Sequence, residues 1–201
     1  AMFAAGDYAT IRRYNGQAWP PMAPGASVRL NGIWGTSSSN VYAVGNGGTI
    51  LHYDGVDDNL DGSLWDPMTS GTTASLLGVW GRSASDVYAV GEEGIILRYN
   101  GSLWSPMSSG TTRSLAGVWG APSSSNVFAV GEYGIILRYN GSIWTTMPSP
   151  TTQWLSAVWG ESSSSVFAVG DGGTILYFNG TNWSPKKAGT STTMALRGVW
   201  G

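Results

Sequence analysis

The sequence predicts an all-β protein assembled from repeats of roughly 40 residues, each folded as a four-stranded antiparallel sheet. The first observation is a hexapeptide, LAGVWG from Leu115, that recurs with small changes along the chain. The second is that a VYAVG-like segment, a glycine-bounded turn and an ILRYNG-like segment follow each internal copy in the same order. The third is composition: 42% of residues are hydrophobic, only 11% are charged and 30 are glycine, which is typical of short strands joined by turns.

Two series of tryptophans mark the repeats. The hexapeptide tryptophans are spaced by 46, 39, 40 and 41 residues, and a second tryptophan occurs in every unit, so ten of the eleven tryptophans occupy repeat positions. The hexapeptide series is Trp34, Trp80, Trp119, Trp159 and Trp200. The second, which we call the outer series, is Trp19, Trp65, Trp104, Trp144 and Trp183.

Each unit contains four short predicted strands. In the unit that begins at Leu76, the hexapeptide is the first strand, with Leu76, Gly78 and Trp80 expected on one face. A serine-rich turn then precedes a second strand over 87–90, a glycine turn leads to a third over 95–99, and a fourth lies around Trp104. The two middle strands are apolar on both faces, which indicates a sheet covered on both sides.

The two ends of the chain complete one another. The last hexapeptide, 196–201, has no continuation, while residues 1–29 have the later strands without a hexapeptide before them. We therefore predict four complete units, 30–75, 76–114, 115–154 and 155–195, and a fifth made of 196–201 with 1–29. Stacked units of this kind describe a five-bladed β-propeller in a single domain, 1–201, whose C-terminal strand pairs with the N-terminal strands near Met2 to Gly6.

The repeat pattern GVWG…VYAVG…ILRYNG…W resembles the tandem propeller repeats of exported bacterial proteins, and the blade count is similar to that of the five-bladed tachylectin type. The chain is similar to WD-repeat and Kelch propellers in architecture only. The Gly-His and Trp-Asp signature of the former is absent, and the paired glycines of the latter are not matched consistently. The resemblance implies a secreted or cell-surface bacterial protein, but propellers serve as enzymes, lectins and scaffolds alike.

Charge and composition exclude several classes of function. A net charge of −2 provides no basic surface for nucleic acid. There is no run of 18 apolar residues that would span a membrane. The sequence has no cysteine, which excludes disulfides and thiolate metal sites. We expect a monomer.

An insertion lengthens the first internal repeat, which reads YDGVDDNLDGSLWD where other units read YNGSLW. Asp57, Asn59 and Asp61, followed by Gly62, match the first half of a calcium loop, in which alternate oxygen ligands converge on one ion. Asp66 falls one position too late for the next ligand, and no acid stands at the twelfth position. The insertion is therefore either a weak structural calcium site or a solvated acidic extension of a hairpin.

Two further polar columns recur in the repeats. The turn between the second and third strands carries Asp7, Asn46, Glu92, Glu132 and Asp171. These are ordinary turn residues, or an acidic collar for a cation or sugar. The third strand carries Arg13, His52, Arg98, Arg138 and Tyr177. Three arginines are similar to the carboxylate clamp of sialidases, but no pair of carboxylates is marked out for proton transfer, and arginine stems commonly cover apolar surface.

These patterns predict a non-enzymatic binding module. The outer tryptophans would line repeated pockets between blades that bind carbohydrate, because indoles stack on sugar faces and linked weak sites raise avidity. The structural alternative is that both tryptophan series hold blades together. The functional alternatives are a protein-binding scaffold, a repeat-derived, engineered or truncated propeller without a ligand, and, last, a sialidase-like hydrolase.

Overall fold

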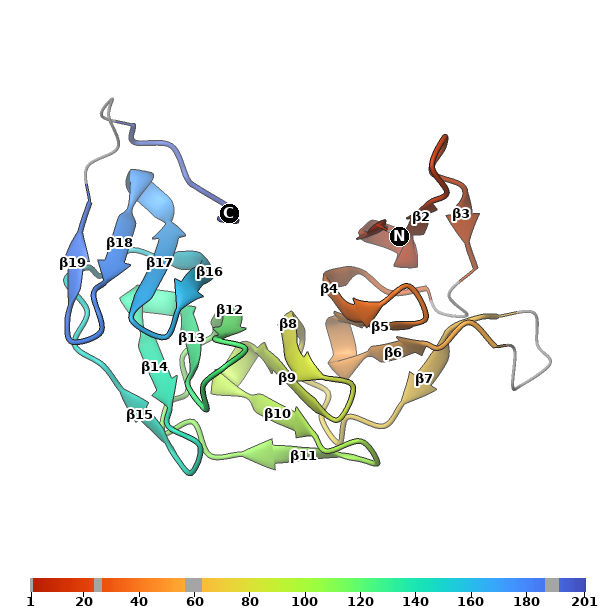
Figure 1. Ribbon diagram of the computed structural model, residues 1–201, viewed down its shortest axis with the longest axis horizontal. Coiled ribbons are helices and arrows are strands. Elements are labelled where there is room, and N and C mark those ends of the chain that lie inside the picture. Colours follow the sequence, from red (N-terminus) through yellow and green to blue (C-terminus); the bar gives the residue numbers. More distant parts are fainter. Residues whose placement is uncertain (1, 24–26, 57–62, 187–191) are drawn as a thin grey trace. The chain divides into compact units, whose positions relative to one another are not determined.

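The structure is a computed structural model that describes residues 2–23, 27–56, 63–186 and 192–201. Five antiparallel sheets follow one another along the sequence, and Figure 1 shows their strands in chain order. We call these sheets blades 1 to 5. Contacts divide the chain into two compact units, Ala1–Ala89 with Leu97–Pro106 and Val90–Ile96 with Met107–Gly201. The first unit contains blades 1 and 2 and most of blade 3, and the second contains blades 4 and 5.

The strands of each blade are as follows. Blade 1 contains β1 (Met2–Ala5), β2 (Ile11–Tyr14) and β3 (Pro21–Met22). Blade 2 contains β4 (Leu30–Ser37), β5 (Asn40–Gly45), β6 (Ile50–Tyr53) and β7 (Asp66–Met68). Blade 3 contains β8 (Leu76–Ser83), β9 (Asp86–Gly91), β10 (Ile96–Tyr99) and β11 (Trp104–Met107). Blade 4 contains β12 (Leu115–Gly120), β13 (Val127–Gly131), β14 (Ile136–Tyr139) and β15 (Trp144–Thr146). Blade 5 contains β16 (Leu155–Ser162), β17 (Ser165–Gly170), β18 (Ile175–Phe178) and β19 (Trp183–Pro185).

A short 3-10 turn joins the second and third strands of the repeat in every blade. These turns are η1 (Asp7–Ala9), η2 (Asn46–Gly48), η3 (Glu92–Gly94), η4 (Glu132–Gly134) and η5 (Asp171–Gly173). Four of the five turns end in glycine, and η1 ends in Ala9, whose φ is +51°. Gly94 shows what favours glycine: its φ is +71°, and a Cβ on it would lie 2.1 Å from the carbonyl oxygen of Thr111.

The five sheets confirm the predicted all-β fold of a five-bladed β-propeller, and each internal hexapeptide is the first strand of its blade. Within the described residues, blade 1 contains three strands, β1, β2 and β3. The pairing of 196–201 with the N-terminal strands stays a prediction. The backbone bond found for this segment runs from Leu196 N to Gly170 O (3.0 Å) in blade 5.

The expected alternation of faces along the hexapeptide is also modified. In β4, β12 and β16 the register with the next strand shifts between the first and third residues of the hexapeptide. Such a bulge places an extra residue in one strand and turns the following side chains relative to strict alternation. The bulge lets Leu115, Val118 and Trp119 all be buried within β12.

The core consists of the middle strands packed face to face between blades. In blade 2, Val41, Ala43, Leu51 and Tyr53 are all at most 3% exposed, and they pack with Trp65 and with Ile11 of blade 1. The predicted two-sided burial of the middle strands is therefore found where a neighbouring blade covers each face.

Candidate binding site

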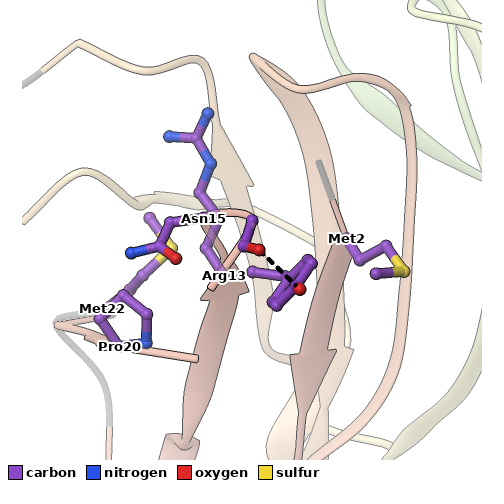
Figure 2. Close-up of a pocket in the computed structure, with 7 residues that line it drawn as sticks. Met2, Arg13, Asn15, Pro20 and Met22 are labelled. Atoms are coloured by element: carbon purple, nitrogen blue, oxygen red, sulfur yellow. Dashed lines mark hydrogen bonds between the residues drawn. The ribbon is translucent and has the colours of Figure 1, made fainter. Parts of the chain in front are cut away.

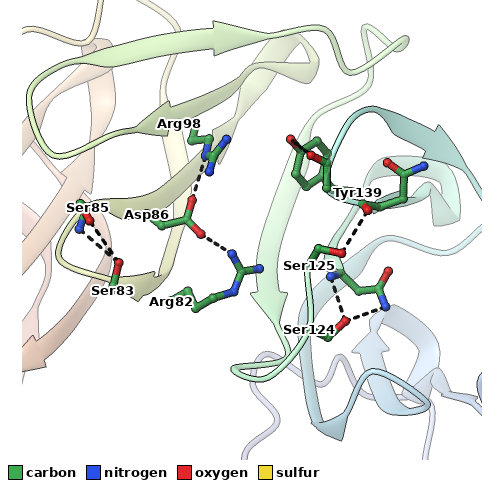
Figure 3. Close-up of polar contacts among 11 residues, drawn as sticks. Arg82, Ser83, Ser85, Asp86, Arg98, Ser124, Ser125 and Tyr139 are labelled. Carbon is green, nitrogen blue, oxygen red and sulfur yellow. Dashed lines mark hydrogen bonds and ion pairs between the residues drawn. The ribbon is translucent and has the colours of Figure 1, made fainter.

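The arginines of the third strand bond to protein side chains: Arg13 Nη1 donates to the Tyr53 hydroxyl of blade 2 (3.0 Å), and Figure 3 shows the contacts of Arg98. In blade 3, Arg98 Nε donates to Asp86 Oδ1 (2.8 Å), and Arg82 pairs with the other carboxylate oxygen of Asp86. The Arg98 guanidinium also lies 5.6 Å from the ring centre of Tyr88. In blade 4, Arg138 Nε donates to Asn126 Oδ1 (2.9 Å). These contacts give the arginines a structural role in place of a clamp for a ligand carboxylate.

The acidic and amide side chains of the turn column contact the start of a hexapeptide. Asp7 pairs with Arg29 (3.1 Å) and Asp171 with Arg197 (3.2 Å). Asn46 Oδ1 accepts from Asn31 Nδ2 (3.0 Å), and Glu132 Oε2 accepts from Ser114 N (3.1 Å). Each partner lies within one residue of the hexapeptide leucine, so these four side chains fix where an inner strand begins.

Four of the outer tryptophans are buried. Trp65, Trp104, Trp144 and Trp183 are 1%, 7%, 8% and 7% exposed, whereas Trp19 is 40% exposed. The ring of Trp104 lies 5.3 Å from that of Tyr99 and 6.1 Å from that of Tyr42, measured between ring centres. These tyrosine rings therefore occupy space beside the indole in which a sugar would have to stack. Stacking of carbohydrate on the outer series stays a prediction, and its burial favours the structural alternative.

A cavity of about 580 Å³ lies where the outer strand of blade 2 meets the outer hairpin of blade 3. Its side chains combine an acidic edge with an apolar floor. They are His52, Asp54, Asp66, Pro67, Met68, Thr69, Ser102, Leu103 and Trp104. Leu103 is 55% exposed, and Ile143 in the same place of blade 4 is 59% exposed. The volume lies in the range of small-molecule sites.

Burial favours the neutral form of His52 in this cavity. Its Nε2 lies 2.7 Å from Asn40 Oδ1, and because an amide oxygen only accepts, Nε2 carries the proton. Burial lowers the pKa of His52 below its ordinary 6.5, and Asp54 and Asp66 oppose this shift only in part. Asp54 Oδ1 accepts from Val56 N (2.8 Å), which fixes its carboxylate in a turn. Asp54 and Asp66 therefore form the acidic edge of the cavity.

Sequence reasoning named His52 as a repeat position and Asp66 as a late calcium ligand, and it did not name Asp54. A signal was present, because blades 3 and 4 carry Asn100 and Asn140 where blade 2 has Asp54. Blades 3 and 4 likewise carry Ser105 and Thr145 where blade 2 has Asp66. Comparing the repeats column by column isolates these charges as departures from the repeat.

A second cavity, of about 860 Å³, lies on blade 1. Figure 2 shows Met2, Arg13, Asn15, Pro20 and Met22 around it. The Tyr14 hydroxyl in its wall donates to Gly16 O (2.8 Å). The cavity lies against the three-stranded sheet of blade 1.

The predicted calcium ligands Asp57, Asn59 and Asp61 lie outside the described residues, and calcium binding stays a prediction. Within the part of the chain that the structure describes, no group of three or more His, Asp or Glu side chains is arranged to hold a metal ion. In the same residues, no helix has the length and apolar character needed to cross a membrane.

Comparison with known proteins supports the fold. No protein-family profile matches the chain, and no curated protein matches it. A solved structure of the propeller protein YCF48, described as bound to D1 peptide, resembles it with a TM-score of 0.64 and 19% sequence identity. The likeness covers 90% of this chain and 61% of that protein, so the chain spans less than two thirds of its length. At this identity the likeness shows a shared propeller fold.

Proposed function

We propose that the chain is a non-enzymatic protein-binding scaffold, and that the cavity between blades 2 and 3 binds a peptide segment of its partner. The observation that carries this proposal is that the carboxylates of Asp54 and Asp66 and the exposed side chain of Leu103 line the same cavity. A segment with a lysine or arginine beside an apolar residue fits this chemistry, because the cation meets the carboxylates and the apolar side chain covers Leu103 and Met68.

Two further observations support a peptide ligand. The structurally similar YCF48 propeller is described with a bound peptide. The polar groups of the cavity are also fixed by the protein itself, His52 by Asn40 and Asp54 by Val56 N, which suits a rigid binding surface.

Carbohydrate is the second candidate ligand. The carboxylate oxygens of Asp54 and Asp66 are suitable acceptors for sugar hydroxyls, and Trp104 contributes to the cavity lining. Against it, Trp104 is only 7% exposed and is packed against Tyr99, so its face is covered.

Selection from a displayed library of random peptides, beside a glycan array, tests the proposal. Selected peptides should contain a basic residue next to an apolar one, and their affinity should fall with rising salt. Asp54→Asn and Asp66→Ser introduce residue types that blades 3 and 4 carry at these places, so the fold should be retained. Each substitution removes one charge-assisted hydrogen bond to the peptide and should weaken binding about tenfold.

The matched control is the equivalent residue of the next blade. Leu103→Ser should weaken peptide binding, whereas Ile143→Ser, at a residue 59% exposed on blade 4, should leave it unchanged. Equal effects of the two substitutions, or a library that yields no peptide on folded protein, would overturn the proposal. Binding on the glycan array alone would favour carbohydrate.

A further inference from the structure

The outer strand of each blade lies at an edge of its sheet. In blade 4 the strands follow the order β12, β13, β14 and β15, and Figure 1 shows β15 beside β14. Thr145 and Thr146 of β15 are exposed. In the part of the chain that the structure describes, no further strand pairs with β15. Such an edge presents unpaired backbone N–H and C=O groups, with which an extended segment of another protein can pair.

Four of the five outer strands carry a proline at the same place. The place lies two residues after the tryptophan of the outer series, and its prolines are Pro21, Pro67, Pro106 and Pro185. Blade 4 has Thr146 there. Proline has no N–H, and in sheets it is found at edges, where it prevents a further strand from pairing. Four blades are therefore protected against an added strand at this place, and blade 4 is not.

The N–H of Thr146 points away from its own sheet. Along an antiparallel strand, successive N–H groups point alternately toward the neighbouring strand and away from it. The next residue, Met147, donates its N–H to Ile136 O (2.9 Å). In blade 5, Lys186 N donates to Ile175 O in the same way (2.8 Å). The preceding place therefore faces outward in both blades, where blade 5 has a proline ring and blade 4 has an accessible N–H.

The length of this edge indicates what it can bind. β15 has three residues, Trp144–Thr146, and Pro148 again removes an outward N–H two places after Thr146. A stable interface between two folded proteins buries about 1,200 Å² or more, which an edge of three residues does not supply. This argues against a second copy of the chain as the occupant. A short extended segment, held mainly by backbone hydrogen bonds, suits the edge better.

We propose that the outer edge of β15 binds an extended, uncharged segment of a protein partner, which becomes a fifth strand of blade 4. The backbone N–H and C=O of Thr146 form the central pair of hydrogen bonds with it. β15 carries no charged side chain, and Thr145 and Thr146 are β-branched and exposed. The segment therefore contains threonine, valine or isoleucine beside them, because such residues form favourable cross-strand pairs. This second site does not rest on the cavity between blades 2 and 3.

Three substitutions isolate the backbone N–H. Thr146→Pro introduces the residue that the other blades carry, so the fold should be retained. It should weaken binding more than about tenfold, because it removes one hydrogen bond and places a ring in the path of the segment. Thr146→Val keeps the N–H and loses only the hydroxyl, so it should bind as the unchanged chain does. Pro185→Thr opens the same place in blade 5 and should add a second equivalent of bound peptide.

The probe is a displayed library of random peptides, selected on the unchanged chain and depleted on Thr146→Pro. Circular dichroism and thermal melting first establish that the variant folds. A selected peptide is then synthesised with single N-methyl groups along its backbone. Methylation of every second amide should abolish binding and methylation of the amides between should not, because only alternate N–H groups face the edge. Leu103→Ser should leave binding unchanged, which separates this site from the cavity between blades 2 and 3.

Four results would contradict the proposal. The first is that no peptide remains after depletion on folded Thr146→Pro. The second is that methylation at successive amides weakens binding equally. The third is that Pro185→Thr still binds one equivalent, so that the proline does not decide where the segment binds. The fourth is a dimer in light scattering that Thr146→Pro dissociates, which would make the occupant a second copy of the chain.

Discussion

Gly160→Ala tests whether the last glycine of the hexapeptide is fixed by packing against the preceding indole. A Cβ at this position would lie 2.6 Å from the carbonyl oxygen of Ser165 and 2.8 Å from the Trp119 ring. Ordinary contact begins near 3.4 Å, so the oxygen or the new methyl group must move by about 0.8 Å. Trp119 is only 7% exposed and the oxygen belongs to the sheet, so neither has room to move.

We expect Gly160→Ala to lower the free energy of unfolding by about 3 kcal/mol, at the upper end of the range for overpacking. For a chain of this size the melting midpoint should fall by about 6–12 °C, which differential scanning calorimetry measures. The matched control is Gly32→Ala. The nearest atoms there lie at 3.3 Å, and blade 5 carries Ala157 in the same place of its hexapeptide, so the change should stay within about 0.5 kcal/mol.

Equal midpoints for the two variants would refute this packing argument. A second comparison separates the two contacts. Trp119→Phe replaces the indole by a smaller ring. In that background Gly160→Ala should lower the free energy of unfolding by less than in the unchanged chain, and the loss that remains is due to the Ser165 oxygen. An identical cost in both backgrounds would show that the indole contributes nothing to the requirement for glycine.

Three further predictions concern titratable groups. Asp86→Ala leaves two arginines without their carboxylate and should lower the free energy of unfolding in urea by about 2 kcal/mol, whereas Asp86→Asn, which reproduces the Asn126 pairing of blade 4, should cost about half as much. Burial lowers the pKa of His52, so the stability due to its neutral form is complete above pH 6.5 and declines as the pH falls through the lowered pKa. His52→Arg should remove this component from melting midpoints measured across that range, and an unchanged pH profile would contradict the assignment. Burial raises the pKa of Tyr42 to about 12, so an ultraviolet titration should show one phenol ionising near pH 12 that Tyr42→Phe eliminates. Stability due to the neutral phenol should be complete below pH 10 and decline as the pH rises toward 12.

The sequence predicts the strands well because their signals are local. The predicted second and third strands, 87–90 and 95–99, correspond to β9 and β10, and the glycine turn between them is η3. Alternation of apolar and polar residues, β-branched residues and turn glycines are each recognised from a few neighbouring residues, and they recur in every repeat. Repetition therefore compensates for the weakness of each single signal.

The candidate site was harder to predict because exposure depends on which blade covers which face. Trp19 and Trp65 hold the same place in their repeats, yet one is 40% exposed and the other 1%. The cavity beside Leu103 likewise arises where two blades meet, and its aspartates are informative only as departures from the repeat.

The contact between a hexapeptide tryptophan and the next hexapeptide also bears on how such a chain can change its length. The tryptophan comes from one repeat and the glycine that it covers comes from the next, as Trp34 with Gly81 and Trp119 with Gly160 show. Removing or duplicating one whole repeat deletes or adds one tryptophan and one glycine together, so the contacts that remain keep the same chemistry. The number of blades can therefore change in steps of one without any compensating substitution.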